Sequence, residues 1–149
     1  MGRIDAQSAG RMITLSARPE PVQIAVGRSA VVVVDMQNDF GARGGMFDRA
    51  GIDIAPIERV VEPTARVLDA ARAAGVPVVY LTMQFSPDLA QLGSEDSPNQ
   101  VKHHRLALGT TMTAPDGRPG RILVEGTWNT EILPRLMPRP GDLIVPKHR

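Results

Sequence analysis

Two charged side chains stand just after apolar runs that predict buried strands. Asp35 follows residues 30–34, an unbroken run of alanine and valine, and Lys147 comes two positions after residues 143–145. In open α/β sheets, ligands bind beyond the carboxyl ends of the strands, where a carboxylate can accept a proton and an ammonium group can stabilise an anion. Position alone leaves a structural alternative open, in which Asp35 caps the following loop and Lys147 is a solvated strand end.

The segments around Asp35 predict a strand, a helix and a second strand. Residues 30–34 are typical of a strand that is buried on both faces of a parallel sheet. Apolar residues recur at helical spacing over residues 56–74, and Gly75 is the expected stop. Residues 76–83 then form a second apolar run. Because such crossovers are right-handed and make the two strands parallel, the sequence predicts the α/β class.

The remaining segments are less regular. The opening segment, up to Gly27, contains Pro19 and Pro21 and is predicted to be irregular. Residues 84–120 form a long polar connection, which is more often a lid or binding segment than an idle loop, with one short helix expected at 101–108. Three short elements complete the prediction: an edge strand at 122–124, a helix at 130–137 and a strand at 143–145.

Length and composition predict one globular domain over residues 1–149. Hydrophobic residues make up 42% and charged residues 22%, and the formal net charge is +1. The charges are interspersed, so neither a nucleic acid nor a membrane is expected as a partner, and a small-molecule substrate is the default. Charged residues also interrupt the first 21 positions, which excludes a signal-peptide pattern in them, and we expect a cytoplasmic protein.

No metal and no cofactor are predicted. The chain has no cysteine, which excludes thiolate ligands. His103 and His104 are adjacent, so they do not face one metal ion together, and we interpret them as a polar surface pair. The glycines within residues 41–45 do not open a helix directly, and they therefore form no phosphate-binding fingerprint.

Four runs of sequence resemble one known family. They are residues 30–40 (AVVVVDMQNDF), 71–80 (ARAAGVPVVY), 126–128 (GTW) and 140–149 (PGDLIVPKHR). In this order and spacing they resemble the isochorismatase-like cysteine hydrolases, which include isochorismatases, nicotinamidases and several amidohydrolases. The resemblance implies a three-layer, Rossmann-like parallel sheet with helices on both faces.

The resemblance also implies an Asp, Lys and Cys triad, whose matching positions here are Asp35 and Lys147. In such a triad a thiolate attacks a carbonyl carbon, the carboxylate takes the thiol proton and the lysine stabilises both anions. Because the chain has no cysteine, the resemblance places the nucleophile beyond Arg149, and we expect a domain that is incomplete at its carboxyl end. Members of the family are commonly homo-oligomers, which we expect here as well.

Residues 93–108 and 126–128 look most similar to the ureidoacrylate amidohydrolases of pyrimidine degradation. This similarity implies hydrolysis of a linear amide or carbamoyl C–N bond. Asn99 could then hydrogen-bond a ureido or carboxylate group, although a solvated loop residue is the alternative. Phe85 and Trp128 could form apolar walls of the pocket, and core packing is the alternative for both.

Two other functions stay open. The first is hydrolysis of a vinyl ether, as in isochorismatases, which are described as using no cysteine nucleophile. The second is a non-catalytic remnant or fragment. We expect these 149 residues alone to show no amidohydrolase activity, for want of the nucleophile, and to expose an apolar strand face.

Overall fold

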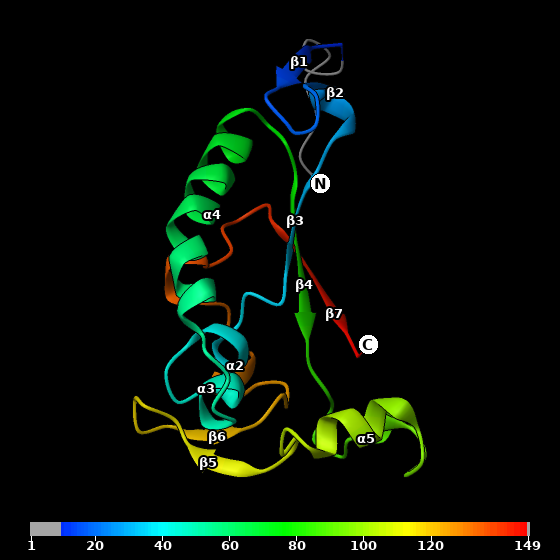
Figure 1. Cartoon of the computed structure of the whole chain (residues 1–149), viewed down its shortest axis with the longest axis vertical. Coiled ribbons are helices and arrows are strands. Elements are labelled where there is room, and N and C mark those ends of the chain that lie inside the picture. The colour runs from blue at the N-terminus through cyan, green and yellow to red at the C-terminus, as the bar shows by residue number, and fades with distance from the viewer. Residues whose placement is uncertain (1–9, 149) are drawn as a thin grey trace.

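The computed structural model describes residues 10–148 and has a parallel sheet at its centre. Its strand order is β3 (Val31–Val34), β4 (Val78–Met83) and β7 (Leu143–Lys147). Both strand pairs are parallel, and Val34, Leu81 and Val145 stand in one row across the sheet. The predicted α/β class and the parallel pairing of the first two strands are therefore confirmed (Figure 1).

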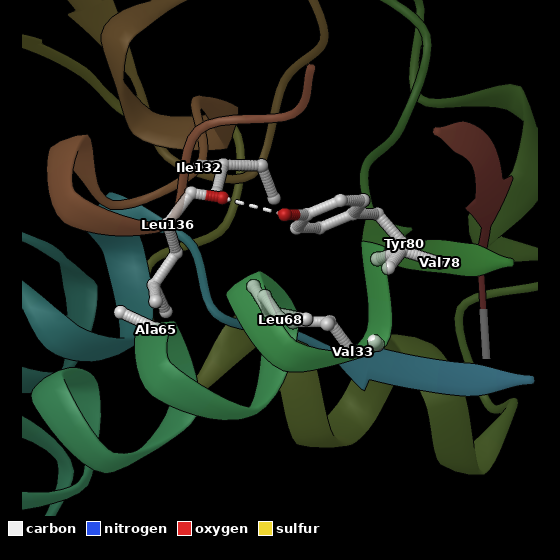
Figure 2. Close-up of a cluster of buried hydrophobic side chains, with 8 residues drawn as sticks. Val33, Ala65, Leu68, Val78, Tyr80, Ile132 and Leu136 are labelled. Atoms are coloured by element: carbon white, nitrogen blue, oxygen red, sulfur yellow. Dashed lines mark hydrogen bonds between the residues drawn. The ribbon is translucent and has the colours of Figure 1, made fainter. Parts of the chain in front are cut away.

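One long helix, α4 (Ala55–Ala73), connects β3 to β4 and covers one face of the sheet. It buries Ala65, Leu68 and Ala71, which follow the spacing of a single helical face. Pro63 lies within it, and Gly75, with φ of +72°, follows its carboxyl end in the left-handed conformation that favours glycine. The helix contacts Val33, Val78 and Tyr80 of the sheet together with Ile132 and Leu136, and this cluster is the main core (Figure 2).

A hydrogen-bonded cluster of Arg72, Tyr80 and Asp142, here called the lock, lies at the end of this core that is remote from Lys147. Arg72 of α4 donates to both carboxylate oxygens of Asp142, at 2.5 and 3.3 Å, and to the hydroxyl of Tyr80 at 3.0 Å. The Tyr80 hydroxyl in turn donates to the Leu136 carbonyl at 2.7 Å, the dashed contact in Figure 2. The lock therefore joins α4, β4 and the turn before β7.

A second core lies beyond the carboxyl ends of the strands. There α2 (Asn38–Gly41) and α3 (Met46–Arg49) pack beside a hairpin of β5 (Thr111–Thr113) and β6 (Pro119–Arg121). The buried carboxylate of Asp39 holds these parts together, because it accepts hydrogen bonds from Met46 N, Leu123 N and Asn129 Nδ2. Burial raises the pKa of Asp39 and outweighs these three bonds, which act to lower it.

Three sequence predictions for local structure were wrong. Among the described residues of the opening segment, β1 (Met12–Leu15) and β2 (Val22–Ala25) form an antiparallel hairpin followed by η1 (Val26–Arg28); residues 1–9 lie outside the described part. Residues 122–124 form no strand, and only Val124 makes an isolated bridge, to Phe85. The predicted helix at 130–137 is replaced by two 3-10 turns, η3 (Trp128–Thr130) and η4 (Pro134–Leu136), since Pro134 and Pro138 interrupt it.

The other connections are short helical turns. The long polar segment after β4 contains η2 (Ala90–Leu92) and α5 (Pro98–His104), and the helix begins at Ser97, whose hydroxyl accepts a bond from Gln100 N. The predicted helix at 101–108 therefore exists but starts three residues earlier. Among residues 10–148, no helix is both long and apolar enough to cross a membrane.

The sheet face opposite α4 is bare within the described residues. Along this face the register aligns Val32 with Leu143 and Val34 with Val145, and these four aliphatic side chains belong to residues that are 45–57% exposed. A sheet face of this kind is an apolar patch on the surface of the described residues, and the predicted exposure of an apolar strand face is confirmed.

The lock gives a pH-dependent contribution to stability. Burial by itself raises the pKa of Asp142, but the hydrogen bonds and charges of Arg72 and Arg139 outweigh it, and the pKa is lowered from its ordinary value of 3.8. The stabilisation is therefore present above pH 3.8 and is lost as the pH falls through the lowered pKa. We expect Asp142→Asn to reduce the free energy of unfolding at neutral pH by about 2 kcal/mol, the scale of a hydrogen bond to a charged group. Urea unfolding at neutral pH and at pH 3 measures this, and an equal loss at both would contradict it.

The bare face predicts dye binding. Val34→Thr combined with Leu143→Thr keeps β-branched side chains but adds hydroxyl groups, and we expect weaker fluorescence of the apolar probe ANS and less light scattering at high protein concentration. Val67→Thr is the matched control, because Val67 is 54% exposed on α4 rather than on the sheet. Equal effects of the control and the double variant would show that this face is not the dye-binding surface.

Candidate active site

Asp35 stands where β3 ends and the chain turns away. Its N–H donates to the Leu81 carbonyl at 3.0 Å, the final main-chain bond of the β3–β4 pairing. Its φ of +57° lies in the left-handed region, which costs a residue with a Cβ about 1 kcal/mol and which aspartate tolerates better than most residues. Gln37 N then donates to the Asp35 carbonyl at 2.8 Å and closes a tight turn. The strained backbone aims the carboxylate across the sheet edge.

Lys147 is the last residue of β7, and its side chain lies against Asp35. Lys147 Nζ is 3.0 Å from each carboxylate oxygen and donates a well-directed hydrogen bond to Oδ2. The side chains are 26% and 31% exposed, so the pair is partly shielded from water. The sequence prediction that these two residues lie together at the carboxyl edge of a parallel sheet is confirmed.

The two oxygens of Asp35 differ in the hydrogen bonds that they accept. Oδ2 accepts the directed bond from Lys147, whereas Oδ1 is enclosed, lies at the same 3.0 Å from Lys147 Nζ and accepts no well-directed hydrogen bond from any described residue. Oδ1 therefore keeps a lone pair that can accept a proton. The ammonium group beside it can stabilise an anion formed at the same place.

A cavity of about 600 Å³ opens beside this pair. Lys147 and His148 form one wall, and Ala90, Gln91 and Gly93 of the η2 segment form the other. A volume of this size suits a small molecule. A second cavity, of about 510 Å³ and lined in part by Arg49 and Arg105, lies elsewhere. Lys147 lines the first cavity and neither residue of the pair lines the second, so the lysine is the member of the pair that meets the first cavity directly.

Helix α5 brings Asn99 to the same region. Asn99 Nδ2 donates to the His148 carbonyl at 3.4 Å, next to Lys147 in the chain. The predicted substrate-binding residue Asn99 thus lies beside the residue that follows Lys147, and its side chain holds α5 against the end of β7. Whether it also binds substrate stays a prediction.

The interpretation of His103 as a surface residue was wrong. His103 is 2% exposed, its ring meets Phe85 edge to face at 5.3 Å, and its Nδ1 donates to the Asn99 carbonyl at 2.7 Å. Burial lowers the pKa of His103 most, the bond to Asn99 acts to raise it, and the charges of Lys102 and Lys147 lower it further. His103 is therefore a neutral residue of the second core, and the apolar spacing of α5 gave no signal for it.

Phe85 and Trp128, the two predicted pocket walls, differ in burial. Phe85 is fully buried, and its ring lies 5.3 Å from that of His103 and 5.9 Å from that of His148, so packing beneath the site is the role that the structure shows. Trp128 is half-buried at the start of η3, and its carbonyl accepts a bond from Asn38 Nδ2 at 2.8 Å. Within residues 10–148, no group of three His, Asp or Glu side chains is close enough to hold a metal ion.

The Asp35–Lys147 pair lies at the carboxyl edge of a parallel α/β sheet, where ligands bind in open α/β folds. The isochorismatase domain family matches residues 29–149, and the chain belongs to that family. It is 43% identical to the ureidoacrylate amidohydrolase RutB of Rhizobium rhizogenes over 143 residues, which are 96% of this chain and 57% of the relative. It is also 43% identical to RutB of Agrobacterium fabrum over 137 residues, covering 92% of this chain and 59% of that protein.

Among solved structures, a cysteine hydrolase from Pseudomonas syringae pv. phaseolicola 1448A superposes with a TM-score of 0.61 at 29% identity. The superposition covers 84% of this chain and 48% of that one. The chain spans somewhat more than half the length of the two RutB relatives and about half of this solved structure.

The ion pair predicts that the two lysines of the chain, Lys102 and Lys147, differ in how their rates of acetylation respond to a change at Asp35. We expect Asp35→Asn to speed acetylation of Lys147 about two- to fivefold, the ratio that corresponds to a partly exposed ion pair of about 0.5–1 kcal/mol. Asparagine tolerates the same left-handed backbone, so the fold should be kept. Lys102, which is exposed, serves as the internal control in the same mass spectrum. An unchanged ratio of the two rates would show that the pair does not persist in solution.

Proposed function

We propose that this chain carries the general base and the lysine of an amide C–N hydrolase that acts on a linear, ureidoacrylate-like substrate. The observation that supports this most directly is the Asp35–Lys147 pair at 3.0 Å beside a cavity of suitable size. The names of the relatives at 43% identity support the choice of an amide, and their substrate name supports a ureido acid.

In the proposed reaction, Asp35 accepts the proton of a thiol through Oδ1, and the thiolate adds to the carbonyl carbon of the substrate. The C–N bond breaks as Asp35 returns the proton to the leaving nitrogen, which leaves a thiocarbamate. Water then adds to the thiocarbamate carbon and gives one proton to Asp35. The C–S bond breaks, Asp35 passes that proton to the leaving thiolate, and the released carbamate decomposes to ammonia and carbon dioxide. Lys147 holds Oδ2 and stabilises the anionic thiolate.

None of the 149 residues is a cysteine, so the thiol in this reaction comes from outside these residues. The solved relative is named a cysteine hydrolase, which supports a thiol as the nucleophile. Asn99, held beside His148 by α5, is the residue of the described chain best placed to meet a polar end of the substrate.

Chemical rescue tests this proposal on the chain as it exists. With ureidoacrylate and no added thiol, we expect no turnover. Adding a small thiol such as cysteamine should give C–N cleavage, followed as released ammonia, at about ten times the rate seen with Asp35→Asn or Lys147→Met, a modest share of what a positioned general base contributes. Asp142→Asn, which alters the turn before β7 at the opposite end of that strand from Lys147, is the control that should retain the effect.

Equal thiol-dependent rates for the native chain and both site variants would overturn the proposal. Turnover of isochorismate without added thiol would instead support vinyl-ether hydrolysis.

A further inference from the structure

The side chain of Gln37 replaces main-chain pairing where β3 ends. After the Asp35 N–H bond to Leu81, the turn takes the main chain away from β4. Gln37 then reaches back with its amide: Nε2 donates to the Met83 carbonyl at 3.1 Å, and Oε1 accepts from Met83 N at 2.7 Å. This exchange of two bonds with one residue is the one that the main chain makes in a hydrogen-bonded antiparallel pair.

The amide of Gln37 is fully used. Its second N–H donates to the Thr130 carbonyl at 2.8 Å, and the residue is 0% exposed. Its main chain bridges to Ile132, so the residue also joins the segment around η3 to the sheet. Because Oε1 faces an N–H group and Nε2 faces two carbonyl oxygens, the orientation of the amide is fixed.

These bonds connect the two residues of the candidate active site. Met83 is the register partner of Lys147 in the β4–β7 pair, and its Sδ lies 3.7 Å from Lys147 Nζ. On the other side, Gln37 N closes the turn that holds Asp35 in its left-handed conformation. One buried side chain therefore spans from the turn that carries Asp35 to Met83, the β4 residue that pairs with Lys147.

We propose that Gln37 is a positioning residue, which sets the separation of the Asp35 carboxylate from Lys147 Nζ without touching the substrate. Its effect on catalysis rests on the proposed function, but its effect on the pair does not. Without the amide, three buried main-chain groups, Met83 N–H and the carbonyls of Met83 and Thr130, lose their partner, and the end of β4 is free to shift relative to the turn.

Two variants test this. Gln37→Glu keeps the shape of the side chain but replaces its two N–H donors with a carboxylate oxygen that faces two carbonyl oxygens. Gln37→Met keeps the length of the side chain without its polar atoms. The methionine variant is used if the glutamate variant fails to fold. We expect either one to speed acetylation of Lys147 relative to Lys102 about two- to fivefold, the full effect expected for a lost ion pair of this exposure. Asp142→Asn, which weakens the fold at the far end of the sheet, should leave the ratio unchanged.

A double-mutant cycle separates positioning from general destabilisation. If Gln37 acts through the Asp35–Lys147 pair, Asp35→Asn combined with Gln37→Met should change the lysine ratio no further than Asp35→Asn alone. Additive effects, or an equal change in Asp142→Asn, would overturn the assignment. The lysine ratio requires no turnover, so a failure of the thiol rescue with a positive cycle would reject the proposed function and leave the positioning role standing.

Discussion

The parallel register of β3, β4 and β7 is the constraint on which the rest of the structure depends. It brings Asp35 and Lys147, 112 positions apart, to the same edge of one sheet, because all three strands run in the same direction and end on neighbouring rows. Parallel strands need long crossovers, and α4 provides the first by packing its apolar face on the sheet. The lock of Arg72, Asp142 and Tyr80 joins α4 and β4 to the turn before β7, at the end of the sheet opposite the Asp35–Lys147 pair.

Beyond the sheet edge, hydrogen bonds from buried polar side chains, rather than main-chain pairing, connect the segments. Gln37 pairs with a strand end, and Asp39 accepts three bonds that join α2, α3 and the segment after β6. Such groups are costly to bury unless every partner is present, and they therefore define one arrangement of the surrounding loops. This rigidity matters for the candidate active site, because a base and a lysine must keep their separation to within a fraction of an ångström.

The sheet also shows a mismatch between its composition and its surroundings. Its strands are rich in β-branched residues on both faces, the pattern of a sheet that is covered twice, yet α4 covers one face and the described residues leave the aliphatic side chains of Val32, Val34, Leu143 and Val145 exposed. Because that face stays exposed within residues 10–148, its side chains contribute little hydrophobic free energy to folding. The stability of this part of the chain therefore rests on the core under α4 and on the second core around Phe85.

The sequence by itself determined the α/β class and the strand–helix–strand unit around Asp35, because these follow from local apolar periodicity and from the handedness of crossovers. It also predicted the meeting of Asp35 with Lys147, since each follows an apolar run typical of a buried strand and the family resemblance pairs the two positions. It did not determine the hairpin of β1 and β2, the two 3-10 turns in place of a helix, or the burial of His103, since each depends on contacts with distant segments. Gln37 also looked like an ordinary loop residue. Only the tertiary structure places Met83 and Thr130 around its amide, because hydrogen bonds between residues 46 and 93 positions apart leave no local pattern in a chain.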